Sequence, residues 1–474
     1  MVDTGGLMLY IFCRDIQRGM GINMRKKILH AIILAALVLL AASCERAPEG
    51  SAEQDAPDAA GPSDTPGEVG APGAEDGLGF DRVAEFSEGF AAVYKSAEGG
   101  WGYIDATGGL AIPYAFSGAA PFADGLAVVT LTGGDEENPY RYGLINKNGE
   151  VVAPIEYEYL GDFHDGLALV SVRDAEAEMQ MYGYIDADGQ IAIPLEYEGA
   201  SDFSEGMARV SVEGWNGFID TKGRIVVPLD YLDAGSFSEG LAAVYENSKY
   251  GYIDKAGKVV IPFEFDFAGA FSEGLAIAAK SSGAGSAKWG YIDKAGKAVI
   301  PFEYLSANDF TGGIGVVGMG DGSGYAFVDK AGRIIVRHAD YVSVLDFREG
   351  LAAVRLGGSW GFIDMAGRLA IAGEYEAVGG RGFSGGLAMV KDNNKWGFID
   401  KAGNVVVPLE YDALFEFSDG FAAAVKNGKC GVIDTADNTV EPFVHELVGF
   451  VAEGFAFAQD DGVWRLLKLI QSST

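Results

Sequence analysis

The sequence predicts an all-β fold, a tandem array of about eleven short repeats in which each repeat is a three-stranded β-meander. Three elements recur in one order over residues 80–474: Phe-x-x-Gly, then aromatic-Gly-aromatic-Ile-Asp, then Asp-x-x-Gly before a β-branched run that ends in Pro. The first element recurs from Gly89 to Gly454 in ten steps, and such a period indicates a repeat architecture. Glycine makes up 69 of 474 residues, about twice its usual share, which favours many tight turns.

One copy shows what each element does. Alternation of side chains predicts strands at Leu241–Tyr245, Tyr250–Asp254 and Lys258–Ile261. Asp254 begins a four-residue turn, in which we expect its carboxylate to accept hydrogen bonds from the backbone that follows. Gly257 ends the turn with a positive φ, which suits the twist of a hairpin.

The middle strand of this copy predicts how copies meet. Tyr250 and Tyr252 lie on one face of the strand and Ile253 lies on the other. Gly251 leaves a gap on the second face, and we expect this gap to let a neighbouring copy approach closely. The closing Pro262 cannot donate to a β-ladder, so it either ends its strand or lies at a sheet edge.

The segment 263–270 links this copy to the next, and Phe263 and Phe265 are placed to fill the space between units. A lone three-stranded meander is marginally stable, so the copies must stack and bury each other's aromatic faces. We therefore expect a curved or superhelical β-array. One or two β-propeller-like rings are the alternative, which is disfavoured because a blade has four strands and propellers usually have about four to eight blades.

The copies resemble the WG-repeat family, also called KWG repeats. The resemblance is carried by four pairs in the second element, Trp101-Gly102, Trp289-Gly290, Trp360-Gly361 and Trp396-Gly397. It implies an exported or surface-associated bacterial protein with a binding or scaffolding role, and it supplies neither a catalytic residue nor a ligand. The copy at 325–337 lacks the closing Pro and the next has Gly373 there, which could mark a break between two sub-arrays near 325–375.

The first 44 residues predict a signal peptide with a lipobox. Arg25, Lys26 and Lys27 precede the apolar run 28–42, which is short for a membrane span and suits a signal peptide. Small residues lead directly into Cys44, so we expect this cysteine to be lipidated and to become the mature N-terminus. An ordinary cleaved signal and an uncleaved anchor are the alternatives.

Residues 45–79 predict a disordered tether, since they are rich in Pro, Ala, Gly, Ser and acids. Translation could begin at Met20 or Met24 rather than Met1, because the stretch before them has no export character. The predicted location is therefore the bacterial membrane, through a lipid anchor, on the periplasmic or the cell-surface side. The net charge of −33 disfavours a nucleic acid partner.

No catalytic residue, metal site or cofactor is predicted. The glutamates of Phe-Ser-Glu-Gly recur in many copies, whereas a catalytic acid pair is needed once, so a turn or capping role is expected for Glu88, Glu205, Glu239 and Glu273. Ser359 and Ser384 match GxSxG only formally. His164, His338 and His445 lack metal-ligand spacing, Asp186–Gly189 lacks most ligands of a calcium loop, and Cys430 is expected to be a small buried residue.

Insertions suggest where a partner binds. The three longest, Thr132–Arg141, Arg173–Met181 and Ser281–Lys288, all fall between the first and second predicted strands, which places them on one edge of the array. The acidic candidates on this edge are Glu136, Glu137, Glu176 and Glu178. The sequence thus favours a membrane-tethered, non-enzymatic binding or scaffold protein with an envelope protein or glycan partner. A carbohydrate-active enzyme with an inter-repeat acid pair and a purely structural spacer are the alternatives, and the oligomeric state stays open.

Overall fold

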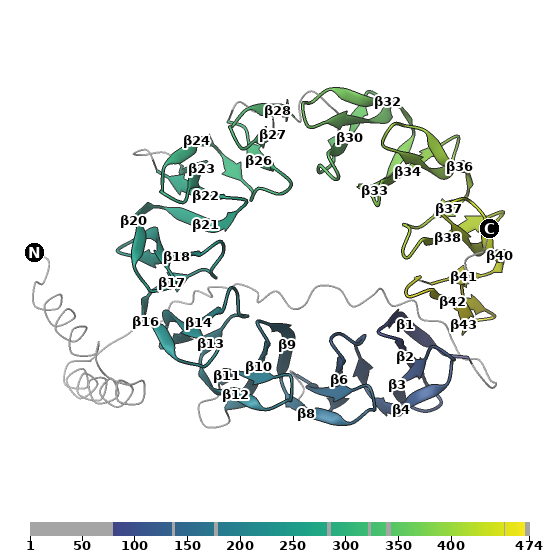
Figure 1. The fold of residues 1–474 in the computed structure, drawn as a ribbon, viewed down its shortest axis with the longest axis horizontal. Coiled ribbons are helices and arrows are strands. Elements are labelled where there is room, and N and C mark those ends of the chain that lie inside the picture. Colours follow the sequence, from purple (N-terminus) through teal and green to yellow (C-terminus); the bar gives the residue numbers. More distant parts are fainter. Residues whose placement is uncertain are drawn as a thin grey trace, which may run out of the picture. The chain divides into compact units, whose positions relative to one another are not determined.

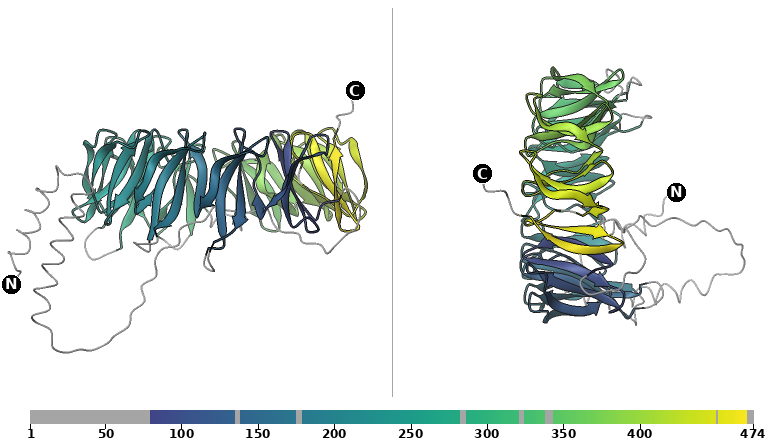
Figure 2. Two further views of the ribbon diagram at one scale, coloured as in Figure 1. Left: turned by 90° about the horizontal axis from the view of Figure 1, so that it is seen from below. Right: turned by 90° about the vertical axis from the view of Figure 1, so that its right-hand side faces the viewer.

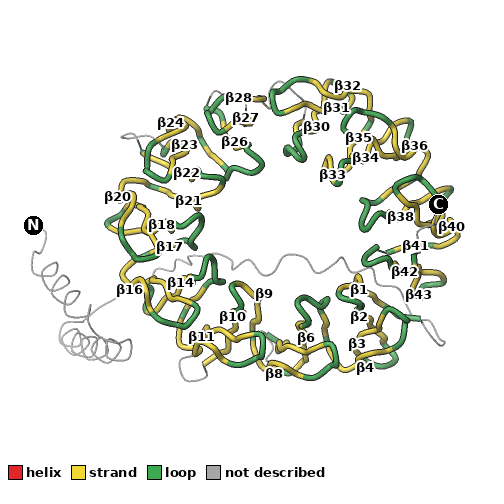
Figure 3. The backbone as a smooth tube through the Cα atoms, in the orientation of Figure 1, coloured by secondary structure: helices red, strands yellow, loops and turns green. Residues whose placement is uncertain are grey.

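The computed structural model describes residues 79–469 apart from 135–137, 175–178, 282–285, 321–323, 338–342 and 450. The regular structure in this part of the chain consists of β-strands alone (Figure 3). The strands form eleven antiparallel sheets, each built from consecutive strands. The predicted signal peptide 1–44 with Cys44, and all of the predicted tether except Gly79, lie outside the described residues.

The sheets are numbered as blades 1 to 11 in chain order, and blade 11 has three strands where the others have four. Blades 1 to 4 contain β1 (Arg82–Ser87), β2 (Phe90–Lys95), β3 (Gly100–Asp105), β4 (Leu110–Phe116); β5 (Gly118–Ala119), β6 (Leu126–Thr132), β7 (Tyr140–Asn146), β8 (Val151–Tyr157); β9 (Tyr159–His164), β10 (Leu167–Asp174), β11 (Met179–Asp186), β12 (Ile191–Tyr197); β13 (Gly199–Ala200), β14 (Met207–Val212), β15 (Trp215–Asp220) and β16 (Ile225–Tyr231).

Blades 5 to 8 contain β17 (Asp233–Ala234), β18 (Leu241–Glu246), β19 (Lys249–Asp254), β20 (Val259–Phe265); β21 (Phe267–Ser272), β22 (Leu275–Lys280), β23 (Lys288–Asp293), β24 (Ala298–Tyr304); β25 (Ser306–Ala307), β26 (Ile314–Gly318), β27 (Tyr325–Asp329), β28 (Ile334–Arg337); β29 (Ser343–Val344), β30 (Leu351–Leu356), β31 (Ser359–Asp364) and β32 (Leu369–Tyr375). Blades 9 to 11 contain β33 (Ala377–Ser384), β34 (Leu387–Asp392), β35 (Lys395–Asp400), β36 (Val405–Tyr411); β37 (Ala413–Leu414), β38 (Phe421–Lys426), β39 (Lys429–Asp434), β40 (Thr439–His445); β41 (Leu447–Val448), β42 (Phe455–Asp460) and β43 (Val463–Lys468).

The blades stand side by side in a closed ring, an eleven-bladed β-propeller (Figure 1). The first strand of each blade lies nearest the centre and the fourth lies at the rim, and the ring is a flat band when seen edge-on (Figure 2). The prediction of a curved or superhelical array is therefore wrong, and the alternative of a single ring is right. Eleven units exceed the usual number of blades in a propeller, but a small turn at each junction suffices to close a ring of this size.

The predicted three-stranded unit lacks one strand. In blade 5 the predicted strands correspond to β18, β19 and β20, and the additional strand is β17, only two residues long. With two residues, β17 is too short to show alternation, and the equivalent first strand of blade 6, β21, begins within the segment 263–270 interpreted as a link. Phe265, in the segment 263–270 that follows the predicted strands of blade 5, is buried between blades 5 and 6, as expected.

A bulge in the outer strand explains the glycine of the aromatic-Gly-aromatic element. Tyr250 pairs with Phe265 and Tyr252 pairs with Ile261, so three residues of β20 stand opposite one residue of β19. A Cβ on Gly251 would lie 2.7 Å from the backbone oxygen of Ile261. The expectation that this glycine admits a neighbouring copy is therefore wrong, because the close approach comes from the fourth strand of its own blade.

The closing proline lies within this bulged edge strand, at Pro262 in blade 5, so the second of the two sequence alternatives holds. The turn before it forms as predicted. The Asp254 carboxylate accepts hydrogen bonds from the backbone N–H groups of Ala256 and Lys258, both at 3.0 Å, and Gly257 has a φ of +78°. This turn joins the third and fourth strands of one blade, and it recurs in successive blades.

Aromatic side chains fill the junctions between blades, which confirms the predicted nearest-neighbour packing. Tyr252 is fully buried, its ring centroid lies 5.0 Å from that of Phe271 in blade 6, and its hydroxyl donates to the Gly269 carbonyl oxygen at 2.8 Å. Ile253 faces the opposite junction, toward Phe218 of blade 4. Aromatic pairs of this kind contribute about 0.5–1.5 kcal/mol each beyond the burial of their area.

The ring closes between its two ends. The backbone N–H groups of Phe80 and Trp464 each donate to the other residue's carbonyl oxygen at 3.2 Å, so Phe80 adds to the open side of β43. Phe86 of blade 1 stacks on Phe455 of blade 11 with 4.5 Å between ring centroids. Blade 11 thus pairs with the beginning of the ring, a mode of closure that needs both ends of the array.

The irregular copies fall in ordinary blades. Phe327 and Val336 of blade 7 share one hydrophobic cluster with Val354 and Ile363 of blade 8. The described residues of 325–375 therefore pack like the rest of the ring, and the suggested break between sub-arrays has no counterpart among them.

Candidate binding face

The meander divides the connections of the ring between two faces. Turns from first to second strand and from third to fourth strand lie on one face, here called the turn face; in blade 5 these are Glu239-Gly240 and Asp254–Gly257. Connections from second to third strand, and the links between blades, lie on the opposite face, here called the loop face; in blade 5 this includes Asn247-Ser248. The two faces are the two edges of the band in Figure 2.

On the turn face, each first-to-second-strand turn places an acid in a strained conformation. Ser238 and Leu241 exchange backbone hydrogen bonds of 2.9 and 3.2 Å across a two-residue turn. Glu239 and Gly240 at its tip have φ angles of +53° and +87°. Glycine adopts such angles freely, whereas glutamate does so at a cost in conformational energy. The glutamate at this position therefore needs a compensating contact.

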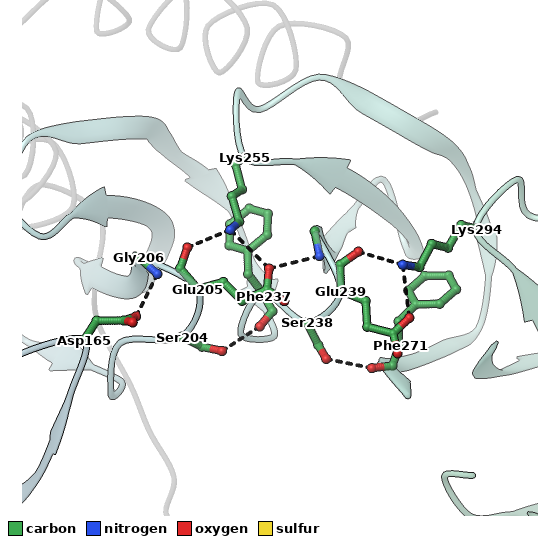
Figure 4. A network of polar contacts seen from close by, with 11 residues as sticks. Asp165, Ser204, Glu205, Gly206, Phe237, Ser238, Glu239, Lys255, Phe271 and Lys294 are labelled. Atoms are coloured by element: carbon green, nitrogen blue, oxygen red, sulfur yellow. Dashed lines mark hydrogen bonds and ion pairs between the residues drawn. The ribbon is translucent and has the colours of Figure 1, made fainter. Parts of the chain in front are cut away.

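The compensating contact reaches the next blade (Figure 4). The Glu239 carboxylate accepts a hydrogen bond from the Gly274 backbone N–H at 3.0 Å and pairs with the Lys294 ammonium group at 3.1 Å. Beside it, the Ser238 hydroxyl donates to the Phe271 carbonyl oxygen at 2.6 Å. One turn therefore binds two turns of its neighbour through three polar contacts.

This arrangement recurs around the ring, and we call it the carboxylate belt. Eight acids accept a hydrogen bond from a turn N–H of the following blade, namely Glu88, Asp165, Glu205, Glu239, Glu273, Glu349, Asp419 and Glu453. Glu453 closes the circle, because it accepts from Glu88 and Gly89 at 2.7 and 2.8 Å. The acids predicted to have a turn or capping role thus cap the turn of the next blade rather than their own.

The lysines of the belt are not among the residues predicted from the sequence, although the sequence contains a signal for them. Five belt glutamates pair with a lysine just after the turn aspartate or asparagine of the next blade: Glu88–Lys147, Glu205–Lys255, Glu239–Lys294, Glu273–Lys330 and Glu349–Lys401. Where the acid position holds Asp124, Asp165, Gly312 or Gly385, the following blade carries Ala187, Thr221, Met365 or Thr435 instead of lysine. Glu and Lys therefore vary together between neighbouring copies, except where the ring closes, since Glu453 is followed by Ala106 at the lysine position of blade 1.

The pKa of each of the five lysine-paired glutamates of the belt is lowered, which holds them in their charged form. A hydrogen bond from Lys330 has the largest effect and lowers the pKa of Glu273; burial opposes it, and the backbone N–H groups of Gly313 and Gly312 lower the pKa further. Lys401 has the same effect on the pKa of Glu349. A general acid needs a raised pKa, so these carboxylates suit capping and not proton donation.

The loop face carries the insertions. Most second-to-third-strand connections are two-residue turns, such as Asn247-Ser248 and Asn393-Asn394, whereas the connections after β2, β6, β10, β22 and β26 have four to seven residues. All four acidic candidates, Glu136, Glu137, Glu176 and Glu178, lie outside the described residues. The described end of the first insertion is anchored to the link before blade 3, since Arg141 pairs with Glu158 at 3.3 Å.

The signature tryptophans stand near this face, at the start of the third strand. Trp101, Trp289, Trp360 and Trp396 are each half-buried, and the glycines that follow them, Gly102, Gly290, Gly361 and Gly397, are buried under the bulge of the fourth strand. Each tryptophan packs on the hydrophobic cluster at its junction. The tryptophans are therefore framework residues with one exposed side.

Other sequence candidates are dispersed. Cys430 is buried, as expected. His445 lies between Asp460 and Glu441, with 2.7 and 3.0 Å from its two ring nitrogens to the carboxylate oxygens. Across the described residues, which exclude His338, no group of three His, Cys, Asp or Glu side chains could hold a metal ion.

The two GxSxG serines lie in strands: Ser359 begins β31 and Ser384 ends β33. A nucleophile elbow joins a strand to a helix, and these strands end in hairpin turns. Asp186 forms the same hairpin turn as the aspartates of other blades, accepting from the Asp188 and Gln190 N–H groups at 3.0 and 2.9 Å.

A family model described as "WG containing repeat" matches nine segments, 101–134, 142–174, 182–214, 217–250, 250–281, 289–322, 325–360, 360–396 and 396–430. The chain belongs to the WG-repeat family. Each WG match begins at the third strand of one blade and ends near the second strand of the next. The WG unit of sequence therefore spans a junction, which is the part of the molecule that two blades share.

Other comparisons of this WG-repeat propeller are weak. It is similar to solved structures of a eukaryotic initiation factor (10% identity, 72% of this chain and 93% of that chain covered, TM-score 0.37) and of Kluyveromyces lactis Hsv2 (11%, 65% and 94%, TM-score 0.28). Likenesses of this degree indicate nothing about function. No curated protein matches the chain. Within the described residues, no helix is long and apolar enough to span a membrane.

Proposed function

We propose that this WG-repeat propeller is a non-enzymatic binding protein of the bacterial cell envelope, which holds a protein or glycan partner on its loop face. One observation carries the proposal. The long insertions all project from the loop face, whereas the turn face is occupied by short turns that bind one another through the carboxylate belt. Variable loops on a rigid scaffold are where binding residues usually lie.

The repeated architecture supports binding through many contacts. Eleven blades present the same kind of edge around the ring, so that several weak contacts with one extended partner add up to a high avidity. The enzyme alternative requires an acid pair between repeats, and the recurring inter-repeat acids are engaged by backbone N–H groups and, in five copies, by lysines. Their arrangement therefore favours a structural role.

A binding experiment with the full chain tests the proposal. Replacing 132–140 and 173–180 with two-residue Asn-Gly turns, which keeps the pairs Leu131–Arg141 and Val172–Met181 of the flanking strands, should reduce the retention of envelope protein or glycan fractions at least tenfold. The matched control is Lys222→Ala, an exposed residue of a turn-face hairpin outside the lysine pairs, which should retain the same fractions as the wild type. Equal retention by the loop-shortened chain would contradict the assignment of the loop face, and polysaccharide hydrolysis abolished by one Asp or Glu substitution would favour the enzyme.

The tether is the second part of the proposal. The ring would be held to the membrane by a lipid on Cys44 through the predicted tether 45–79, and a coil of about 35 residues would have a root-mean-square reach of roughly 30 Å. Cys44→Ala should abolish lipid labelling and move the protein to the soluble fraction, with Cys430→Ala as the control. A Cys44→Ala protein that stays in the membrane fraction would refute the lipid anchor.

A further inference from the structure

We propose that the junction of blades 5 and 6 binds a lysine or arginine side chain of a partner protein, in a groove of aromatic rings and a carboxylate beside the loop face. The inference rests on the proposed function and specifies its ligand chemistry. It follows from the geometry of the groove, from what other blades place at the same positions, and from the charge of the chain.

The groove has a volume of about 230 Å³. It is bounded by β17 and the residues after it on one side and by β21 on the other, and the Tyr250 ring also lines it. Asp233 accepts a hydrogen bond from the Tyr250 hydroxyl at 2.7 Å, and Phe267 is 38% exposed. Pockets for drug-sized ligands measure roughly 300–1,000 Å³, so this groove fits one side-chain-sized group.

Aromatic rings continue from the groove in both directions. The centroid of Tyr250 lies 4.8 Å from that of Tyr245 and 6.3 Å from that of Phe267, whose ring lies 4.8 Å from Trp289. The negative faces of such rings attract cations within about 6 Å of the centroid. Trp289 also adjoins the third insertion, whose described residue Ser281 donates its N–H to the Asp266 carboxylate. The groove therefore opens beside the predicted binding edge.

Other blades show which side chains occupy the positions equivalent to those of the groove. In blade 1, the Arg82 guanidinium lies 5.4 Å from the Tyr94 centroid, and in blade 9 the Lys391 ammonium lies 5.7 Å from the Trp396 centroid. Strand register makes Arg82 equivalent to Asp233. Lys391 is likewise equivalent to Tyr245, because the two residues pair with Trp396 and Tyr250, respectively.

Blade 5 thus places a carboxylate and a ring where two other blades place a cation. Within the described part of the chain, no lysine or arginine stacks on Tyr245, Tyr250, Phe267 or Trp289. The residues 282–285 of the neighbouring insertion contain no cation either. The surroundings of the groove are therefore complementary to a cation that this chain does not supply.

Charge favours the same occupant. The nearby Lys249 pairs with Asp266, which leaves the Asp233 carboxylate as the charge in the groove. Burial and the hydrogen bond to Asp233 raise the pKa of Tyr250 to about 12. The Tyr250 hydroxyl therefore stays protonated and donates to Asp233. The net charge of −33 attracts a basic partner over a longer range. A neutral sugar would use the rings but would gain nothing from this charge.

Peptide titration tests the inference. The probes are Ac-Gly-Arg-Gly-Arg-Gly-NH₂ and the same peptide with citrulline, which keeps the shape of arginine and removes its charge, each titrated calorimetrically into the full chain at low salt. We expect the arginine peptide to bind and the citrulline peptide to bind at least fivefold more weakly. Phe267→Leu, which retains apolar volume but removes the ring, and Asp233→Asn should each weaken the arginine peptide about fivefold.

A charge-matched control separates the groove from the general acidity of the chain. Asp162→Asn removes one exposed carboxylate from β9 and leaves the groove intact, so it should change the affinity less than twofold. No binding of the arginine peptide, equal binding of the citrulline peptide, or equal effects of Asp162→Asn and Asp233→Asn would each overturn the inference. If the peptides fail while loop shortening still abolishes partner retention, the proposed function stands and only the ligand chemistry is wrong.

Discussion

The two faces of the ring differ in how much of their structure is repeated. On the turn face, eight blades use the same carboxylate contact to the next turn, with hydrogen bonds of 2.7–3.1 Å. On the loop face, the connections from second to third strand vary from two residues to seven between copies. The turn face therefore holds the blades together, and the connections of the loop face can vary in length and chemistry.

The largest effect is expected where the framework is most crowded. A Cβ on Gly397 would lie 2.5 Å from the Val407 backbone oxygen, whereas a Cβ on Gly133, in the first insertion of the loop face, meets nothing within 4 Å. Gly397→Ala should lower the free energy of unfolding by about 3 kcal/mol, because backbone must move. Gly133→Ala should change it by less than about 0.5 kcal/mol. Urea unfolding of both variants makes the measurement, and equal effects would remove the distinction between framework and loop.

Breaking one link of the belt should have a smaller effect. Glu239→Gln removes the charge that pairs with Lys294, so we expect a loss of about 1 kcal/mol, as for a partly exposed ion pair with hydrogen bonds. Lys294→Met should cost at least as much, since it removes both the ion pair and the hydrogen bond from the Lys294 ammonium group to the Glu239 carbonyl oxygen. The double variant measures the coupling between the two side chains; strictly additive losses would mean that the pair contributes nothing to stability.

Acid should weaken the turn face selectively. The pKa of Glu273 is lowered from a usual value of 4.5 by its hydrogen bond with Lys330 and by backbone N–H groups. A lowered pKa in the folded state stabilises the fold above the unfolded-state pKa, and this stability is lost as the pH falls through the folded-state value. Between pH 6 and pH 3 the Tm of the wild type should therefore fall further than that of Glu273→Gln, whereas parallel Tm curves would argue against the belt.

The smallest effect on stability is expected from the insertions. Replacing 132–140 with a two-residue turn should change the free energy of unfolding by about 0.5 kcal/mol or less, because the pairing of Leu131 with Arg141 and the contact between Arg141 and Glu158 are both kept. Thermal unfolding of the shortened chain makes this measurement. A loss of several kcal/mol would show that the first insertion belongs to the framework.

The turn of Asp254 and Gly257 and the burial of Tyr252 could be predicted from the sequence, because each depends on neighbours within one copy or on a pattern repeated in all of them. The strand β17 could not, since two residues show no periodicity. Closure could not either, because it depends on the angle at eleven junctions rather than on any residue type. The belt required a comparison of adjacent copies, in which Glu239 predicts Lys294, instead of a comparison of each copy with a consensus.

The closure between Phe80 and Trp464 has a consequence for synthesis. Blade 1 is among the first blades to be made, but its partner contributes Glu453, which is 365 residues from Glu88. Until the last blade emerges, the side of blade 1 that contains Phe86 has no blade against it. A growing chain of this protein therefore exposes one apolar sheet surface at each end of its row of blades. The time before the last blade is made is thus the period in which the risk of aggregation and the dependence on chaperones are greatest.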